Sequence, residues 1–526
     1  MDFAKDFWEN LKETDNFTTT ENGAGAYKST LNACLDAFGS LGAMRKSDDT
    51  TIVSTFEKAF NEDKVLAMRM LFWLRDIRGG IGERRAFRLI LKWLVERHPK
   101  YVLNNLSNIL EYGRGDDYLC LLDTQLRDEV ADFLKKAVEC DLNKSPFQSI
   151  SLLGKWLPSI NTSSAETKRY ANILAKAWGW SPRRYRKTLS TLRLWLNVVE
   201  RNMSANEWKY INYEKVPAKA AMNYSDAFYK HDEVGYGSYL IDVATGNAKV
   251  KSKTLFPVDI VHKIMSSRKR ITGKDIILYN ALWDNLPNYF EKSPDESSIC
   301  VVDVSGSMSG EPMEVAISLG MYCADKCKGP FHNKFITFSD NPRLVEVKGD
   351  DLYDKVHNVE SADWGGSTNI EAVFNLILTT AVQNHCKQED LPSKLYIISD
   401  MQFNDATHGG YYDWRRGKMV HSKPMTFMQQ MRQRYADAGY EMPALVYWNV
   451  RASHCGMFQE TIDGENIAMV SGYSAKLFES VIEGTTYEET VNEKGETVTK
   501  QKIDPMTVML TTLGNERYDK VWTGRV

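Results

Sequence analysis

The sequence predicts a helical-repeat module followed by an α/β domain with a doubly wound sheet. Apolar stripes of helical spacing dominate the first 290 of the 526 residues, and short apolar runs of strand length then alternate with helical segments. The charge changes as well: residues 1–300 carry 44 Lys and Arg against 38 Asp and Glu, whereas residues 301–526 carry 22 against 31. We therefore expect two domains, at 1–290 and 291–526.

The helices expected in the first module are amphipathic and are joined by short segments. Val65–Leu74 and Phe87–Val95 each place their apolar residues at helical spacing. The separators are short and carry Gly, Pro or Asp, as at Arg78–Gly82 and Tyr112–Asp117. No fixed repeat period is present, but the element type and the connection length are typical of stacked helical hairpins. We predict a HEAT-like solenoid or ring.

A polar stretch from Asp284 to Ser298 marks the expected domain boundary. Five apolar runs of strand length follow it, and strands that are apolar on both faces are typical of a parallel sheet covered by helices. These runs are Ile299–Val302, Phe335–Phe338, Leu395–Ile398, Ala444–Trp448 and Ile467–Val470. Further expected elements are helices at 312–327, 369–383, 424–438 and 474–482, a hairpin insertion at about 485–503, and a C-terminal helix.

Five oxygen-bearing side chains are expected at the carboxyl edge of this sheet, where open α/β sheets bind ligands. Asp303, Ser305 and Ser307 follow the first strand, Thr368 precedes a helix, and Asp400 follows the strand that begins at Leu395. Hydroxyl and carboxylate oxygens suit Mg²⁺ best, with Mn²⁺ or Ca²⁺ as alternatives. Because only two carboxylates are present, a bound cation would keep an open position that a carboxylate of a protein partner can fill.

These residues resemble the metal-ion-dependent adhesion site (MIDAS) of von Willebrand factor A domains, over about residues 299–482. The resemblance implies that Asp303, Ser305, Ser307, Thr368 and Asp400 hold the cation and that the site recruits a partner. A metal-dependent nuclease is the catalytic alternative, since two aspartates can support metal-assisted hydrolysis. No general base accompanies them, so we expect that the protein is not an enzyme.

The region 151–275 is strongly basic, with 22 Lys and Arg against 10 Asp and Glu, which indicates an anionic partner. Within it, Ser181 and Pro182 predict the start of a helix whose first turns are cationic. Positive side chains at this end of a helix are repelled by the positive end of the helix dipole, and a bound anion would offset this repulsion. Four candidate cations of this helix lie on the face away from Leu189 and Leu192: Arg183, Arg186, Lys187 and Arg193. The other candidates are Arg184 in the same helix, Lys251 and Lys253 on an expected strand, and Arg268, Lys269 and Arg270. A solvated charged face is the alternative interpretation.

Several short motifs of the first module are similar to one family. They are Arg75–Arg84, Tyr112–Asp117, Trp156–Pro158, Tyr185–Ser190 and Val198–Met203. Together with the following A domain they resemble the Ro-like proteins, in which a TROVE-like helical module precedes a von Willebrand factor A domain, and in particular the DUF2828 branch. This resemblance implies a ribonucleoprotein that binds small non-coding or single-stranded RNA at the cations above. Nearby tyrosines are candidates for base stacking or for the core: Tyr185, Tyr210, Tyr213, Tyr224 and Tyr229.

The rival hypothesis is a metal-dependent protein-interaction scaffold that binds no RNA, because helical solenoids also bind peptides. The composition also indicates the redox state of the cysteines and the location of the protein. Eight cysteines without paired spacing indicate free thiols, and no signal peptide or long apolar run is present. We expect a cytoplasmic protein that binds neither membrane nor DNA.

Overall fold

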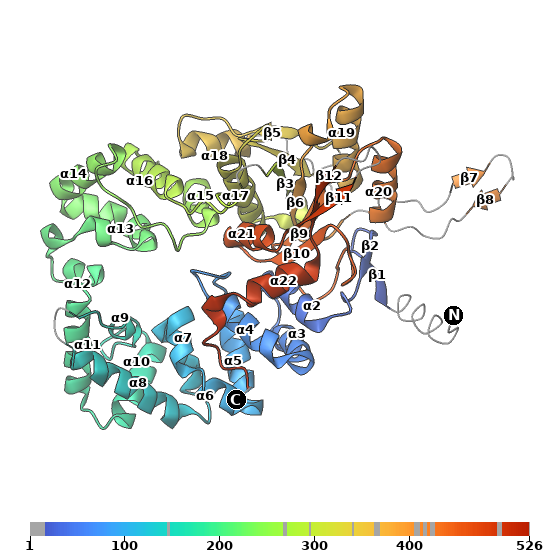
Figure 1. Ribbon diagram of the computed structural model, residues 1–526. Coiled ribbons are helices and arrows are strands. Elements are labelled where there is room, and N and C mark those ends of the chain that lie inside the picture. The colour runs from blue at the N-terminus through green and yellow to red at the C-terminus, as the bar shows by residue number, and fades with distance from the viewer. Residues whose placement is uncertain are drawn as a thin grey trace. The chain divides into compact units, whose positions relative to one another are not determined.

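The computed structural model describes residues 16–144, 148–266, 271–293, 296–338, 341–361, 369–403, 411–413, 418–420, 427–491 and 497–524. The chain forms two compact units (Figure 1). The sheet unit comprises Met1–Glu62, Phe256–Arg268 and Asn288–Gly514, and the helical unit comprises Asp63–Leu255, Lys269–Pro287 and Asn515–Val526. A predominantly helical region followed by an α/β region is therefore confirmed.

A six-stranded sheet with the strand order β10-β9-β6-β3-β4-β5 forms the core of the sheet unit. Its strands are β3 (Ser298–Asp303), β4 (Lys334–Phe338), β5 (Leu344–Glu346), β6 (Lys394–Ser399), β9 (Ala444–Asn449) and β10 (Ile467–Ser471). Every residue of β3, β6, β9 and β10 is buried, as the apolar runs predict. The five predicted strands are confirmed and pair in parallel.

The sheet departs from the expected parallel arrangement at one edge, because β5 pairs antiparallel with β4. Only residues 339–343 separate these two strands. So short a connection cannot make the crossover that a parallel neighbour needs, and the chain turns back on itself. The sheet is therefore mixed.

Helices in the sheet unit lie close to the predicted positions. They are α17 (Glu311–Lys326), α18 (Leu352–Glu360), α19 (Ile370–Gln383), α20 (Phe427–Asp437), α21 (Lys476–Glu483) and α22 (Pro505–Leu513), of which α18 was not predicted. The longest of them, α17, packs against β3, β4 and β6. Three antiparallel strand pairs complete the unit: β1 (Phe17–Thr19) with β2 (Gly25–Tyr27), β7 (Tyr411–Asp413) with β8 (Lys418–Val420), and β11 (Thr486–Val491) with β12 (Thr497–Lys502).

Two early segments of the chain fold with the sheet, so the units do not divide at residue 290 as the sequence predicts. The first contains α2 (Ala33–Ser40), whose residues are almost all buried and which packs against β9, β10 and α22, and α3 (Asp49–Glu62). The second is α15 (Pro257–Met265), which packs against α17 and α18. A helix that is apolar nearly all round needs a core to bury it. The sheet supplies that core, and it draws together segments far apart in the sequence.

The helical unit consists of short helices whose neighbours in the chain often pack together. They are α4 (Lys64–Arg75), α5 (Arg85–Arg97), α6 (Pro99–Leu103), α7 (Leu106–Tyr112), α8 (Arg127–Leu142), α9 (Leu153–Trp156), α10 (Ala165–Ala177), α11 (Pro182–Trp195), α12 (Val199–Ser204), α13 (Ala218–His231), α14 (Glu233–Ala244) and α16 (Gly273–Asp284). Side chains of Asp63, Ser164, Ser181 and Asp232 accept hydrogen bonds from the first turns of their helices. Across the described ranges, no helix has the length and apolar character needed to cross a membrane.

Candidate functional site

Asp303 and Asp400 lie together at the carboxyl edge of the sheet. β3 and β6 are adjacent and parallel, with Val302 opposite Ile398, so the residues that end or follow these strands are neighbours. Both aspartates are largely buried: Asp303 is 0% exposed and Asp400 is 7% exposed. The position matches the place where open α/β sheets bind ligands.

The two serines of the motif lie beside these carboxylates. The Ser305 backbone N–H donates to Asp303 Oδ1 at 2.9 Å, and the hydroxyls of Ser305 and Ser307 are 3.0 Å apart. A hydrogen bond from Ser307 also acts on the Asp400 carboxyl, so Ser307 connects the loop after β3 to the end of β6. Four of the five predicted ligands are therefore brought together. The fifth, Thr368, lies outside the described residues.

Burial is the main influence on the acidity of both aspartates. It raises the pKa of Asp303 to about 6, against hydrogen bonds from Ser399 and Ser305 that favour the charged form. Burial likewise raises the pKa of Asp400, opposed by the Ser307 hydrogen bond and by the charge of Arg451. A cation at this edge would neutralise carboxylates that are costly to ionise in its absence.

The donor set suits a hard cation. Among the residues that the structure describes, no three His, Cys, Asp or Glu side chains form a cluster, so a zinc-type site is not present there. Two carboxylates and two hydroxyls instead offer oxygen ligands, which fit Mg²⁺ with water or an outside ligand completing its coordination.

Three residues near this edge were not singled out from the sequence. Ser399 donates a hydrogen bond to Asp303 Oδ2 at 2.5 Å, and Arg451, which follows β9, donates to the Ser307 carbonyl. The position of Arg451 after a predicted strand was a usable signal. Glu21 raises the pKa of Asp400 through its charge, and its backbone N–H donates to the Gln402 side chain at 2.8 Å. No local pattern could connect Glu21 and Gln402, which are 381 positions apart.

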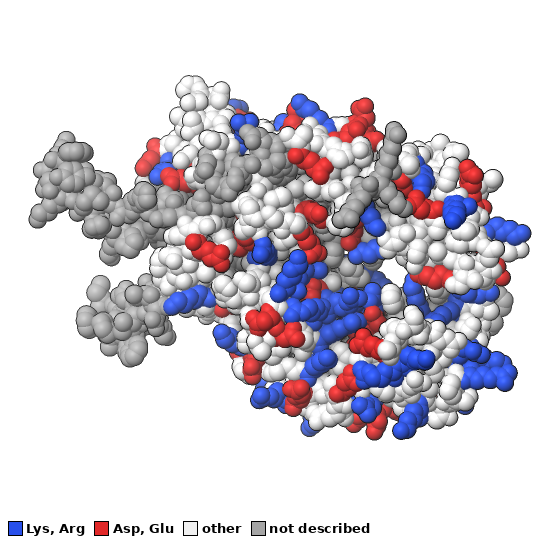
Figure 2. Space-filling model, turned by 180° about the vertical axis from the view of Figure 1, so that it is seen from behind, with Lys and Arg blue, Asp and Glu red and all other residues white. Residues whose placement is uncertain are grey.

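In the helical unit, the cationic start of α11 is exposed as expected. Ser181 accepts a hydrogen bond from the Arg184 backbone N–H at 3.2 Å, and Arg183, Arg186 and Lys187 all point to solvent. None of these three forms an ion pair with any residue in the described ranges. The Arg184 guanidinium lies over the Trp180 ring, 4.5 Å from its centroid. Lys and Arg side chains are interspersed with acidic ones over the face shown in Figure 2.

Arg193 does not lie on this exposed face, contrary to the prediction. At 100° per residue its position is only about 40° from that of the buried Leu189, so it borders the packed side of α11. The guanidinium donates to the Gly154 carbonyl, the Ser159 hydroxyl and the Leu157 carbonyl at 2.9, 2.8 and 2.9 Å. Arg193 therefore holds the segment that follows α9 against α11.

The other basic residues predicted to bind RNA lie in two segments outside α11. The segment carrying Lys251 and Lys253 is not a strand: Lys251 donates to the Lys215 carbonyl at 3.1 Å, and Lys253 is exposed. The chain there is held by the Ser252 hydroxyl, which bonds to the Asn285 carbonyl, and no strand lies beside it in the described part of the unit. Arg268, Lys269 and Arg270 lie outside the described residues.

Most of the candidate tyrosines are not free to stack on a base. Tyr185 and Tyr213 are buried, and Tyr224 is half-buried. Tyr229 is 39% exposed, and its hydroxyl donates to Glu233. Tyr210 is 67% exposed and remains open to a ligand.

Comparison with known proteins matches the two parts of the chain to two family models and most of the chain to one viral protein. A domain of unknown function (DUF2828) matches residues 20–116 and 164–286, and a second (DUF7788) matches residues 297–513. "Uncharacterized protein L728" of Acanthamoeba polyphaga mimivirus is 32% identical over 510 residues, which cover 89% of this chain and 85% of the viral protein. The chain belongs to the family of this viral protein, and its first part carries the DUF2828 domain.

In this DUF2828 protein, two of the short motifs of the first module form a buried ion-pair network. Asp117 is fully buried and binds two arginines: Arg75 Nη2 lies 2.8 Å from Oδ2, and Arg88 Nε lies 2.7 Å from Oδ1. The Arg114 backbone N–H also donates to Asp117, at 2.9 Å. The Arg114 side chain pairs with Asp116. These motif residues serve the packing of the helical unit.

The glycine-rich part of the first motif allows a close approach of backbone to backbone. A Cβ on Gly80 would lie 1.9 Å from the Trp73 carbonyl oxygen, so no other residue fits there. The adjacent Asp76 accepts a hydrogen bond from Arg517 Nη2 at 3.0 Å, and the Tyr112 hydroxyl donates to the Arg517 carbonyl at 2.5 Å. Arg517 thus connects the C-terminal residues to Asp76 of the first motif and to Tyr112 within the helical unit.

Proposed function

We propose that this protein binds RNA through its helical unit and a protein partner through a divalent cation at the carboxyl edge of its sheet. The architecture that we propose is Ro-like, with a HEAT-like helical repeat and a von Willebrand factor A domain. The observation that carries the RNA-binding proposal is the start of α11. Arg183, Arg186 and Lys187 are exposed there and have no counterion among the described residues.

Physical chemistry favours an anionic ligand at this position. Cations in the first turns of a helix repel the positive end of its dipole, and like charges so close repel one another. Phosphates of a nucleic acid would relieve both repulsions and gain bonds from helix N–H groups. The proposal names RNA because of the Ro-like resemblance.

Binding measured against salt tests this proposal. The Arg183→Ala/Arg186→Ala/Lys187→Ala variant should bind a labelled oligouridine more weakly, and the slope of log K against log salt should fall by about two units, since each phosphate contact on single-stranded nucleic acid contributes about 0.7. Fluorescence anisotropy of the labelled RNA gives both quantities.

The matched control removes three exposed cations of the same unit from α5 and α6, with Lys92→Ala/Arg97→Ala/Lys100→Ala. This variant has the same change in net charge, and its salt slope should stay near that of the parent protein. An equal slope in the parent and in the α11 variant would contradict the assignment of RNA contacts to α11.

The sheet edge supports a second candidate function, a metal-dependent protein-interaction scaffold that binds no RNA. Asp303, Ser305, Ser307 and Asp400 offer only oxygen ligands, and no general base lies among them, so the donor set favours binding over hydrolysis. This function would be preferred if the purified protein carried no nucleic acid and held a partner only with Mg²⁺ present.

A further inference from the structure

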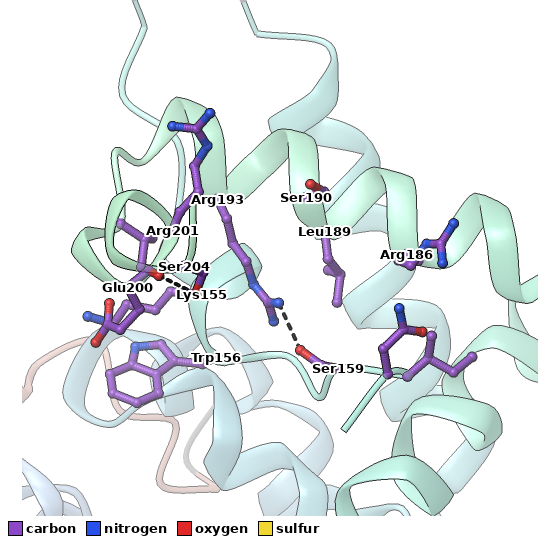
Figure 3. A pocket seen from close by; sticks show the side chains of 13 residues that line it. Lys155, Trp156, Ser159, Arg186, Leu189, Ser190, Arg193, Glu200, Arg201 and Ser204 are labelled. Carbon is purple, nitrogen blue, oxygen red and sulfur yellow. Dashed lines mark hydrogen bonds between the residues drawn. The ribbon is translucent and has the colours of Figure 1, made fainter. Parts of the chain in front are cut away.

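A pocket of about 520 Å³ opens in the helical unit between α9, α11 and α12, and its volume lies within the range of small-molecule sites (Figure 3). Six of its lining residues carry the argument: Lys155, Trp156, Arg186, Arg193, Glu200 and Arg201. Four of the six are cationic and one is acidic. The pocket is separate from the exposed tip of α11, although Arg186 borders both.

The positive charge around this pocket is mostly unbalanced. Arg193 is half-buried and its hydrogen-bond partners are all neutral. Burial lowers its pKa, and the nearby charge of Glu200 offsets only part of this effect. Lys155 and Arg186 have no carboxylate partner within the described ranges, whereas Arg201 is paired with Glu207 at 2.9 Å. A buried or half-buried cation without a counterion is costly, so the pocket favours a ligand that carries an anionic group.

Glu200 places an acidic group in the same pocket, which favours a ligand that also carries hydrogen-bond donors. The Tyr224 hydroxyl hydrogen-bonds to the Glu200 side chain, but the buried Oε2 atom of Glu200 has no hydrogen-bond partner among the described residues. An unsatisfied buried acceptor destabilises the folded protein. A ligand with N–H donors on one edge would satisfy this oxygen, and a charged acceptor makes such bonds stronger than a neutral one.

Trp156 provides an aromatic surface in the same pocket. The Arg114 guanidinium lies 4.2 Å from its ring centroid and Lys155 Nζ lies 5.4 Å away, so cations hold the ring in place. Trp156 and Glu200 lie on one side of the pocket, Arg186 lies on the other, and Arg193 is between them (Figure 3). The donor-binding and anion-binding ends are thus separated.

We propose that this pocket binds one nucleotide of an RNA strand, with its phosphate at Arg186 and Arg193, its base at Trp156 and the N–H edge of the base at Glu200. Guanine is the preferred base because its N1–H and exocyclic amino group form adjacent donors, whereas the single N–H of uracil lies between two carbonyl acceptors that a carboxylate repels. This inference rests on the proposed RNA binding and adds the identity of the base that is read.

Binding of two labelled oligouridines, one carrying a single guanosine, tests the inference on the full chain. The parent protein should bind the guanosine-containing strand about tenfold more tightly, the factor expected when a base-specific hydrogen-bonded pair is worth at least about 1.4 kcal/mol. Glu200→Gln should remove that preference, because the neutral amide binds the guanine N–H groups less strongly and repels the uracil carbonyls less. Trp156→Leu should weaken both strands. Lys187→Ala, on the same helix but outside the pocket, should weaken both strands and keep the preference.

Binding of free guanosine monophosphate, followed by saturation-transfer NMR, separates failure of the inference from failure of the function. Oligouridine binding that needs the α11 cations, without guanosine preference and without response to Glu200→Gln, would overturn the inference and leave RNA binding intact. A second outcome is that the parent protein binds free guanosine monophosphate, that Glu200→Gln does not, and that neither protein binds RNA. This outcome would support the pocket as a nucleotide site and overturn the RNA function. If the protein bound neither RNA nor free guanosine monophosphate, the inference and the proposed RNA binding would both be overturned.

Discussion

Replacing Asp117 with alanine should lower the free energy of unfolding of the helical unit by about 5 kcal/mol, the upper end of the cost of breaking a buried ion pair. The reason lies in its partners. Asp117 is fully buried and neutralises both Arg75, whose side chain is 5% exposed, and Arg88. Without the carboxylate, two guanidinium groups lose their counterion, and Arg75 cannot reach water without disrupting α4 and α7.

Hydrogen exchange read by mass spectrometry gives a local measure of this loss. Peptides from α4 and α5 should lose protection in Asp117→Ala, whereas peptides from β3 and β6 in the sheet unit should not change. Asp117→Asn keeps the shape and some hydrogen bonds and should have a smaller effect.

The matched control is Asp132→Ala, which breaks a pair with Lys136 in α8; the two side chains are 57% and 74% exposed. Exposed pairs contribute less than about 1 kcal/mol, so this variant should lose little protection. A similar small loss in Asp117→Ala would mean that the network does not stabilise the helical unit.

Asp303→Asn should have opposite effects on the metal-free and the metal-bound sheet unit. In the metal-free protein, burial raises the pKa of Asp303 from 3.8 to about 6, so the ionised carboxylate costs about 3 kcal/mol at neutral pH. Because the folded carboxyl binds its proton more tightly than the unfolded one, this cost develops as the pH rises through 4 to 6 and persists above it. The asparagine variant avoids the cost and should unfold at a higher temperature than the parent when no metal is present.

Adding Mg²⁺ should reverse that order. The parent gains stability because the ion binds only the folded site, and the variant gains little because it lacks a charged ligand. We expect the affinity for Mg²⁺ to fall at least about a hundredfold, since loss of a direct ligand exceeds the 10–100-fold cost of losing an outer-shell residue. Thermal unfolding with and without Mg²⁺ measures both effects, and Mg²⁺ should bind more weakly below pH 6, where the proton competes.

Asp350→Asn is the matched control, because Asp350 is an exposed aspartate of the same unit. It should follow the parent in both conditions. Equal Mg²⁺-dependent stabilisation of the parent and of Asp303→Asn would show that the ion does not bind through Asp303.

The five parallel strands of the sheet, and the two aspartates that end or follow them, could be predicted because each depends on local pattern. A run such as Leu395–Ile398 is apolar on both faces, and the residue after a buried parallel strand must reach the carboxyl edge of the sheet. Asp303 and Asp400 therefore meet as expected. The start of α11 was equally readable, since Ser181 and Pro182 are local helix signals.

Other features depended on contacts between distant parts of the chain. The pattern of α2 indicates a buried helix, but nothing in its eight residues specifies that the sheet, and not the neighbouring helices, buries it. The side chain of Arg193 lies at the border of the two faces of α11, where periodicity cannot decide between solvent and the carbonyl groups of residues 154 and 157. The position of Glu21 near Asp400 likewise follows from the packing of the turn between β1 and β2.

The sequence by itself thus determined most of the helices and strands and which oxygen ligands end or follow β3 and β6, because backbone preference and side-chain period act over a few residues. Only the tertiary structure decided that three separate segments build the sheet unit, and that Trp156, Arg193 and Glu200 share one pocket. Burial of apolar surface drives such assembly, and it is not directional, so local sequence cannot name the surface that each segment will cover.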